Sequence, residues 1–158
     1  SDAEPAEALV AREPAAVVLS PGPGRPEDAG CFTELLRILP EATPVLGVCL
    51  GHQAMGIVAG ARVERVTPVH GKASLVHHDG RGILSDVANP FEAGRYHSLV
   101  VTREGLPPEL VLTAWSDDEL VMAAQHRTLP RFGVQFHPES ILTPDGPKII
   151  RNFLFLVG

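Results

Sequence analysis

Short, continuous apolar runs alternate with segments of helical spacing in the first part of the chain. Residues 15–19 (AAVVL) and 45–48 (VLGV) have the length and composition of strands buried in a parallel sheet. Each is followed by helix-compatible residues, over 27–39 and over 50–56, and the second of these segments is closed by Gly56. The order strand, helix, strand, helix predicts an α/β fold with a doubly wound, mostly parallel sheet flanked by helices.

The rest of the chain has a different pattern. Looser alternation, interrupted by Asp-Gly and other turn signals, predicts antiparallel strands within residues 61–76, 95–101, 110–115 and 120–126. A further apolar strand is expected over 132–136, and apolar residues on one side of 147–156 predict a C-terminal amphipathic helix. A short helix is expected within residues 1–14. The pattern is that of one domain, residues 1–158, with an antiparallel β extension.

Composition narrows the class of protein. The chain has 158 residues, of which 44% are hydrophobic and 20% charged, as in an ordinary globular domain. A net charge of -6 argues against nucleic acid as the main partner, and no apolar run has the length of a membrane span. The acidic start SDAEPAEAL lacks the layout of a signal peptide, and the two cysteines fit free thiols in a reducing compartment. These features predict a cytoplasmic protein without a nucleic-acid or membrane partner.

Cys49 is the strongest candidate for chemistry. It lies where the 45–48 strand gives way to a helix, and Gly47 and Gly51 flank it at two residues on either side. Small flanking residues allow the sharp turn that holds a nucleophile in a strained, exposed conformation. The following helix aims its positive end at the same point, so we expect a lowered thiol pKa and a site for an oxyanion. The alternative is a buried cysteine between two packing glycines.

A loop rich in proline and glycine, residues 20–26 (SPGPGRP), follows the 15–19 strand. Proline lacks a backbone N–H and glycine favours turns, so this loop is neither helix nor central strand. Ligands bind at the carboxyl ends of parallel strands in open α/β sheets, which makes the loop a candidate binding segment. A plain rigid turn is the alternative. Cys31 falls inside the helix expected over 27–39 and is interpreted as a structural thiol.

His137 is the candidate base for Cys49. The apolar 132–136 strand ends at this residue, and Glu139 follows two positions later, with Pro138 fixing the backbone between them. A cysteine needs a base to become a nucleophile at neutral pH, and the base needs an orienting group. Cysteine, histidine and glutamate would then form a triad built from two strand ends. Taken alone, a His-Pro-Glu run fits a surface turn equally well. The seven histidines lack the paired spacing of a zinc motif, so no metal is predicted.

Five ordered segments carry a resemblance to a known family. Residues 20–24 (SPGPG), 47–53 (GVCLGHQ) and 133–140 (GVQFHPES) resemble the three signature segments of class I glutamine amidotransferase domains. Residues 70–72 (HGK) and 95–99 (RYHSL) are similar to the glutamine subunits of anthranilate synthase and aminodeoxychorismate synthase. Five segments in the right order are more specific than any one motif, and together they span roughly residues 15 to 156.

The resemblance implies a flavodoxin-like fold and a glutaminase mechanism. The Cys49 thiolate would attack the side-chain amide of glutamine, with His137 as general base and acid, and with Glu139 orienting the imidazole. Backbone N–H groups of Leu50 and Gly22 would hold the oxyanion. Water would then release glutamate from the glutamyl thioester.

The resemblance also implies substrate contacts, a partner and a cofactor assignment. Seven residues are expected to contact glutamine: Gly22, Pro23, Gly24, Leu50, Gln53, Ser98 and Leu99. Tyr96 and His97 are expected either to line the face that docks a partner or simply to pack. The implied partner is a chorismate-using synthase, as a separate chain or a fused domain. No cofactor is implied for this domain, and Mg²⁺ only for the synthase.

The chain departs from the family pattern at its start. Members open with a strand, a helix and a second strand before the region that matches Ser1, so we expect a shortened domain whose sheet exposes apolar edges and faces. Another segment supplying the missing part and a trimmed form of the domain are both open. Besides the glutaminase hypothesis, two others remain: a non-catalytic docking or regulatory module, and a γ-glutamyl hydrolase or peptidase that uses the same Cys-His-Glu set.

Overall fold

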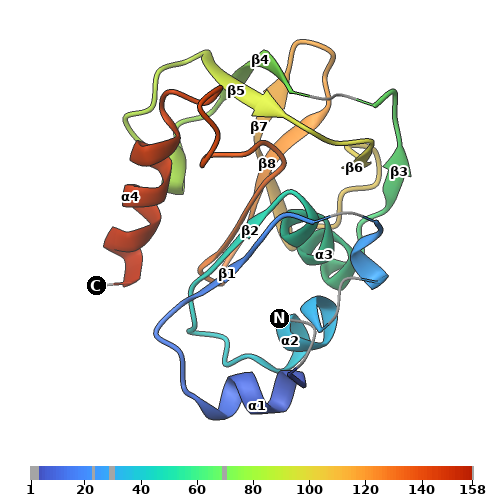
Figure 1. Cartoon of the computed structure of the whole chain (residues 1–158), viewed down its shortest axis with the longest axis vertical. Helices are drawn as coiled ribbons and strands as arrows, with labels where there is room; N and C mark the ends of the chain where they lie inside the picture. The colour runs from blue at the N-terminus through green and yellow to red at the C-terminus, as the bar shows by residue number, and fades with distance from the viewer. Residues whose placement is uncertain (1–3, 23, 29–30, 69–70, 158) are drawn as a thin grey trace.

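A computed structural model describes residues 4–22, 24–28, 31–68 and 71–157 (Figure 1). Seven strands form one sheet in the order β1-β2-β9-β8-β7-β4-β5. The parallel strands are β1 (Val17–Leu19), β2 (Val45–Val48) and β9 (Arg131–Val134). The antiparallel extension comprises β8 (Val121–His126), β7 (Leu110–Ser116), β4 (Lys72–His78) and β5 (Phe91–Arg95). A separate antiparallel pair joins β3 (Val63–Arg65) to β6 (Leu99–Val101).

Helices cover both faces of the parallel strands. On one face lie α1 (Ala6–Ala11), α2 (Phe32–Ile38) and α3 (Leu50–Ala59), and on the other lies α4 (Gly146–Val157) (Figure 1). Two short 3-10 turns, Pro26–Asp28 and Gly82–Leu84, complete the regular structure. The predicted α/β sheet with an antiparallel extension is confirmed.

The alternation of side chains along β2 explains the two cores. Val45 packs with residues of α1, α2 and α3, whereas Leu46 and Val48 pack in the cluster that contains Ile149 and Phe153 of α4. Because successive side chains of a strand point to opposite faces, a strand that is apolar throughout must be covered on both sides. All four residues of β2 are buried, as its unbroken apolar run predicts.

Three predicted elements have different bounds in the structure. The strand expected over 95–101 is two strands, because β5 ends at Arg95, before Tyr96, and β6 begins at Leu99 in the other sheet. Cys31 precedes α2 and occupies its N-cap position, so it is not inside a helix that began at residue 27. Gly56 lies within α3, where its backbone passes Val101 so closely that a Cβ would lie 2.8 Å from Cγ2; the helix ends instead at Gly60, with φ 98°.

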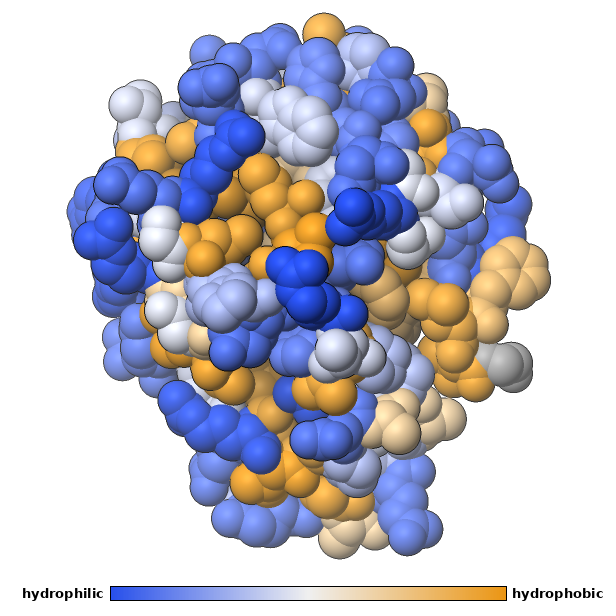
Figure 2. Space-filling view, turned by 180° about the vertical axis from the view of Figure 1, so that it is seen from behind, coloured by the Kyte–Doolittle hydropathy of each residue, from blue (hydrophilic) through white to orange (hydrophobic). Residues whose placement is uncertain are grey.

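Apolar side chains are exposed at two places next to the parallel strands. β1 is the terminal strand of the sheet, and Val18 on it is 58% exposed. Near the end of α4, Leu154, Phe155 and Leu156 are each more than half exposed, and they form the apolar surface at the right edge of Figure 2.

Replacing Gly51 with alanine should destabilise the fold severely. An added Cβ would lie 2.4 Å from the backbone oxygen of Leu19, so α3 would have to move away from β1. We expect a loss of about 3 kcal/mol or more in the free energy of unfolding, measured by urea denaturation. The matched control is Gly60→Ala at the other end of α3, where nothing lies within 4 Å and only the positive φ opposes a side chain. That control should lose only about 1 kcal/mol, and equal losses would contradict the close approach.

Candidate active site

The candidate catalytic residues lie at the carboxyl ends of two neighbouring parallel strands. β2 and β9 pair with Val48 opposite Val134, and the backbone N–H of Cys49 donates to the oxygen of Val134 at 2.8 Å. Cys49 directly follows β2, and His137 follows β9 by three residues. Strand pairing therefore places two residues that are 88 positions apart (137 − 49) after the carboxyl ends of neighbouring strands.

Cys49 has a strained backbone at the turn from strand to helix. Its φ is 52° and its ψ is -98°, a region that residues with a side chain rarely adopt. The turn is held by close packing, because a Cβ on Gly47 would lie 2.6 Å from the backbone carbon of Gly51. Only glycine fits at these two positions. The structure thus has the strained turn that the Gly-x-Cys-x-Gly pattern predicts. The expected exposure of the nucleophile is wrong, because Cys49 is only 6% exposed and is buried between its packing glycines.

The His137 side chain is held by Glu139. Nδ1 of His137 lies 2.6 Å from Oε1 of Glu139, and because a carboxylate oxygen accepts, the proton of a neutral imidazole resides on Nδ1. Nε2 then carries the lone pair that a general base needs. This atom is buried and has no hydrogen-bond partner within the described part of the chain.

The backbone of the His137 segment is anchored from β5 through Thr143. The His137 N–H donates to the oxygen of Gly94 at 3.0 Å, and the Thr143 hydroxyl donates to the oxygen of His137 at 2.7 Å. The same hydroxyl accepts from the N–H of Gly94 at 2.8 Å. Thr143 is only 1% exposed. These three bonds fix the position of the imidazole relative to the sheet.

The sulfur of Cys49 is hydrogen-bonded to an amide and not to the imidazole. Nε2 of Gln135 donates to Sγ at 3.4 Å, and no hydrogen bond joins Sγ to His137 in the residues the structure describes. Hydrogen bonds at catalytic sites are often long before substrate binds, so this separation does not exclude His137 as the base. Proton transfer requires the two side chains to approach each other when substrate binds.

Burial controls the ionisation of the Cys49 thiol. The net effect raises the pKa of the thiol to about 11: desolvation is the largest cause and the negative charge of Glu139 adds to it, while hydrogen bonds from the Leu50 backbone and the Gln135 side chain lower the pKa. The expected lowering of the thiol pKa by the helix end is therefore wrong as a net effect, because the cost of burying a charge exceeds the contribution of these donors.

The predicted glutamine-binding residues fall into distinct environments. Gly22 and Leu50 lie side by side, since a Cβ on Gly22 would be 3.3 Å from Cδ2 of Leu50. Gly24 is exposed with φ 86°, and Pro23 lies outside the described residues. The structure therefore brings the Pro/Gly loop next to the residue after Cys49, which the oxyanion-hole prediction requires.

Gln53 is connected to Leu99 and, through Gln135, to the Cys49 sulfur. Gln53 is 2% exposed, and its Nε2 donates to the oxygen of Leu99 at 2.9 Å and to Oε1 of Gln135 at 3.2 Å. The Ser98 hydroxyl has no hydrogen bond to any other described residue, while its backbone oxygen accepts from Val66 at 2.8 Å. Gln53 is therefore already engaged with protein groups, while the Ser98 hydroxyl is not.

Tyr96 and His97 have different roles in the structure. The Tyr96 ring is 42% exposed and contacts the His137 imidazole edge-on, with 4.9 Å between ring centroids. His97 is buried, and its Nε2 accepts from Nε of Arg95 at 3.0 Å. Burial and the nearby Arg95 charge lower the pKa of His97 to about 4. Of the two expected alternatives, packing describes His97, whereas the exposed Tyr96 borders His137.

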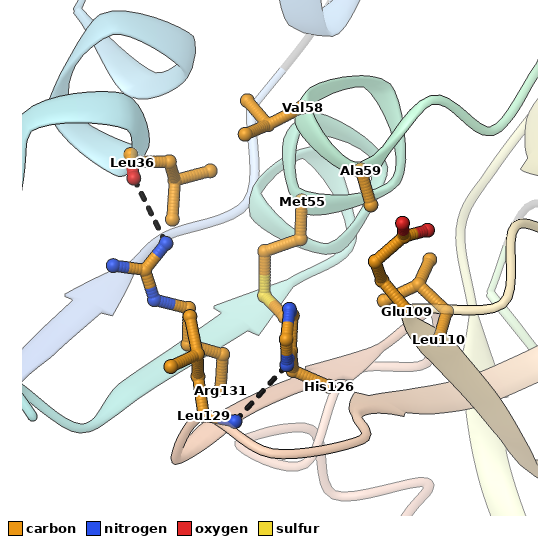
Figure 3. A pocket seen from close by; sticks show the side chains of 9 residues that line it. All are labelled: Leu36, Met55, Val58, Ala59, Glu109, Leu110, His126, Leu129 and Arg131. Carbon is orange, nitrogen blue, oxygen red and sulfur yellow. Dashed lines mark hydrogen bonds between the residues drawn. The ribbon is translucent and has the colours of Figure 1, made fainter. Parts of the chain in front are cut away.

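A cavity of about 230 Å³ lies at the opposite end of the parallel strands (Figure 3). Its wall includes Arg131, which begins β9, where β9 pairs with the start of β2. Nη1 and Nη2 of Arg131 donate to the backbone oxygens of Leu36 at 2.8 Å and Leu39 at 3.4 Å, so the guanidinium caps the end of α2. This arginine has a structural task, and the cavity is not part of the Cys49 site.

Within the described ranges, no three His, Cys, Asp or Glu side chains are grouped so that they could hold a metal ion. Across the same ranges, no helix has the length and apolar character that crossing a membrane requires.

Comparison with known proteins places the chain in a family. The model of the glutamine amidotransferase class-I family matches residues 1–157, so the chain belongs to the class I glutamine amidotransferases. It is 56% identical over 139 residues to aminodeoxychorismate synthase of Streptomyces griseus, covering 87% of this chain and 19% of that protein. It is 48% identical over 148 residues to anthranilate synthase component 2 of Methanothermobacter thermautotrophicus, which covers 92% of this chain and 76% of that protein.

Two further comparisons bear on extent and fold. The chain is 49% identical over 149 residues to the bifunctional protein TrpGD of Thermotoga maritima and spans about a quarter of its length, as it spans about a fifth of the Streptomyces protein. The crystal structure of a putative GMP synthase subunit from Thermoplasma acidophilum superposes with a TM-score of 0.87 at 25% identity, covering 99% of this chain and 78% of that one.

Two residues of the site were missed by sequence reasoning. Gln135 contacts the Cys49 sulfur, and Thr143 anchors the His137 segment. Gln135 had a readable signal, because it is a polar residue in the otherwise apolar strand predicted over 132–136. Thr143 had none, since nothing in its neighbourhood distinguishes it from an ordinary turn residue.

We predict that Cys49 is a slow nucleophile at neutral pH in the free protein. With a thiol pKa of about 11, roughly one thiol in ten thousand is ionised at pH 7. The rate of alkylation by iodoacetamide should therefore rise about tenfold per pH unit from pH 6 to 9 without a plateau. A Cys31→Ala background leaves Cys49 as the one reacting thiol, and mass spectrometry follows the product. A plateau beginning near pH 7 would contradict the dominance of burial.

Backbone strain at Cys49 gives a second prediction. Glycine usually costs about 0.5–1 kcal/mol relative to alanine, but a positive φ penalises alanine by more. Cys49→Gly should therefore unfold at higher urea than Cys49→Ala, with a difference of about 1 kcal/mol in free energy. Equal stabilities, or a more stable alanine variant, would show that the turn is not strained.

Proposed function

We propose that this chain hydrolyses the side-chain amide of L-glutamine through a Cys49 thioester and supplies ammonia to a chorismate-using synthase. The observation that carries the proposal is the convergence of Cys49 and the His137–Glu139 pair at the ends of β2 and β9, in a chain of the class I glutamine amidotransferase family. Among its relatives, those named anthranilate synthase component 2 and aminodeoxychorismate synthase support this choice of partner.

The first half-reaction forms the thioester. As the Cys49 sulfur attacks the amide carbon, its proton passes to Nε2 of His137, and Glu139 keeps the other nitrogen protonated. Because the thiol is protonated at rest, this proton transfer generates the thiolate that forms the carbon–sulfur bond. His137 then gives the proton to the leaving nitrogen, and ammonia departs. Backbone N–H groups of Leu50 and Gly22, which lie side by side, would hold the oxyanion.

The second half-reaction releases glutamate. His137 takes a proton from water, and the resulting hydroxide attacks the thioester carbonyl carbon. The carbon–sulfur bond then breaks, and the sulfur regains a proton from the imidazole. We assign substrate contact to Gly22, Pro23, Gly24, Leu50, Gln53, Ser98 and Leu99, as the family resemblance implies. Gln53 would contact the substrate through Oε1, because both of its hydrogen bonds to protein groups use Nε2. Thiol-dependent amide hydrolysis uses no cofactor, so we assign Mg²⁺ to the synthase alone.

The surface around His137 supports a docked partner. Tyr96 is exposed and its ring contacts the His137 imidazole. Ile141, two residues after Glu139, is 94% exposed. Glu139 and Ile141 line an open groove of about 610 Å³ that continues to Leu154 of α4. We propose that the synthase covers this face and that the reaction takes place in the cytoplasm.

A non-catalytic docking module is the second candidate. The observation that favours it is the state of the thiol, which is buried, un-ionised at neutral pH and not hydrogen-bonded to His137 in the described residues. A γ-glutamyl hydrolase or peptidase would use the same three residues on a different substrate. Substrate choice and partner dependence distinguish all three.

The test is ammonia release from L-glutamine, with and without an anthranilate synthase or aminodeoxychorismate synthase partner plus chorismate. Wild type should release ammonia faster with the partner, and Cys49→Ser should lose activity at least about a thousandfold. Glu139→Gln should lose about ten- to a hundredfold because the imidazole loses its orienting charge. Glu104→Gln, on the turn after β6, is the matched control and should be unchanged.

Three results would count against the glutaminase proposal. Release that survives Cys49→Ser would remove the nucleophile from the mechanism. Partner binding without release would favour the docking module. Faster hydrolysis of a γ-glutamyl peptide than of free glutamine would favour the γ-glutamyl hydrolase.

A further inference from the structure

The alternation of β9 continues past its last residue, Val134, and directs one buried amide at Cys49. Phe132, Val134 and Phe136 face the core that contains α4, so Gly133 and Gln135 face α3. Gln135 is 0% exposed, and its Nε2 lies 3.4 Å from Sγ of Cys49. Within the described residues it is the one side chain that donates a hydrogen bond to the sulfur.

A backbone carbonyl fixes which end of this amide faces the sulfur. The oxygen of Leu99 can only accept, so the nitrogen of Gln53 must face it at 2.9 Å. The same nitrogen then donates its second hydrogen to the oxygen of Gln135 at 3.2 Å. With its oxygen so engaged, Gln135 presents an N–H group to the sulfur. Flipping Gln53 would set its oxygen against the oxygen of Leu99, and flipping Gln135 alone would set two N–H donors against each other, so the chain of bonds determines the orientation.

We propose that Gln135 is the side chain that stabilises the Cys49 thiolate, and that Gln53 and the Leu99 carbonyl hold it in the orientation required. The inference deepens the proposed function, because it concerns the same nucleophile, but it makes no assumption about the substrate. Gln135 transfers no proton. The thiol proton passes from Sγ to His137, while the N–H group of Gln135 keeps its own proton and remains hydrogen-bonded to the sulfur.

The physical effect follows from charge. An N–H donor binds a thiolate more strongly than a neutral thiol, because the acceptor carries a full negative charge. The effect is large here because Cys49 is 6% exposed and water replaces little of a lost donor. When the sulfur bonds to the acyl carbon, the sulfur loses its negative charge and the hydrogen bond weakens. The donor therefore stabilises two states: the thiolate before attack and the thiolate released when the thioester is cleaved.

The test measures thiolate reactivity directly. In a Cys31→Ala background, alkylation of Cys49 by iodoacetamide is followed from pH 6 to 9 for wild type and for Gln135→Met, which keeps the length of the side chain but removes the donor. We expect the rate to fall about ten- to a hundredfold at every pH, with the slope against pH unchanged. The charged group that affects the pKa of Cys49 is Glu139, and neither Cys31→Ala nor Gln135→Met alters it.

Matched variants separate the donor from a general packing effect. Gln125→Met makes the same chemical change on β8, at a residue that has no hydrogen bond to Cys49 or Gln53 in the described chain, and should leave the rate unchanged. Gln53→Met should lower the rate in the same direction but less, since Gln135 keeps its donor and loses only its anchor. It also serves as the second test if Gln135→Met does not fold.

An alkylation rate in folded Gln135→Met that equals or exceeds that of wild type would overturn the inference, as would equal losses in Gln135→Met and Gln125→Met. If Gln135→Met does not fold, an unchanged rate in Gln53→Met overturns it. The outcomes stay distinct from those of the proposed function. A fall in alkylation in a protein that releases no ammonia from glutamine would leave the thiolate donor standing and remove the glutaminase.

Discussion

The close approach of α3 to the parallel strands is the constraint on which the site depends. Gly47 lets the first turn of the helix sit against β2, and Gly51 lets it sit against the backbone of Leu19 on β1. With a side chain at either position the helix would move outward, and Cys49 would no longer turn sharply at the strand end. The positive φ of Cys49, its burial and its contact with Gln135 all follow from this packing.

The same packing sets two opposing demands on the sulfur. Burial excludes water and so disfavours the thiolate, while the first N–H groups of α3 and the Gln135 amide favour it. Burial has the larger effect in the free protein. Such a thiol stays protonated until His137 comes close enough to accept its proton, which would suit the proposed glutaminase, since ammonia is useful only when an acceptor is present.

Much of the fold and most of the site could be predicted from the sequence, for identifiable reasons. Continuous apolar runs predicted β2 as a buried parallel strand and β9 as a further strand, and the flanking glycines located the turn at Cys49. The prediction of a single strand over 95–101 was wrong, because the pattern of apolar and polar residues cannot show that the chain passes from one sheet to another at Tyr96. The net direction of the thiol pKa was wrong because it depends on how completely the sulfur is desolvated. That quantity exists only once the chain is packed.

The nucleophile and the base are attached to different parts of the molecule. Cys49 is held by α3 and the parallel strands, whereas the His137 segment is tied through Thr143 to Gly94 on β5, the far edge strand, and rests on the start of α4 at Gly146. Edge strands open more readily than central ones. Mild heating or denaturant should therefore displace the imidazole while the thiol keeps its surroundings, so that hydrolysis would fail before the sheet unfolds and would return when β5 closes again.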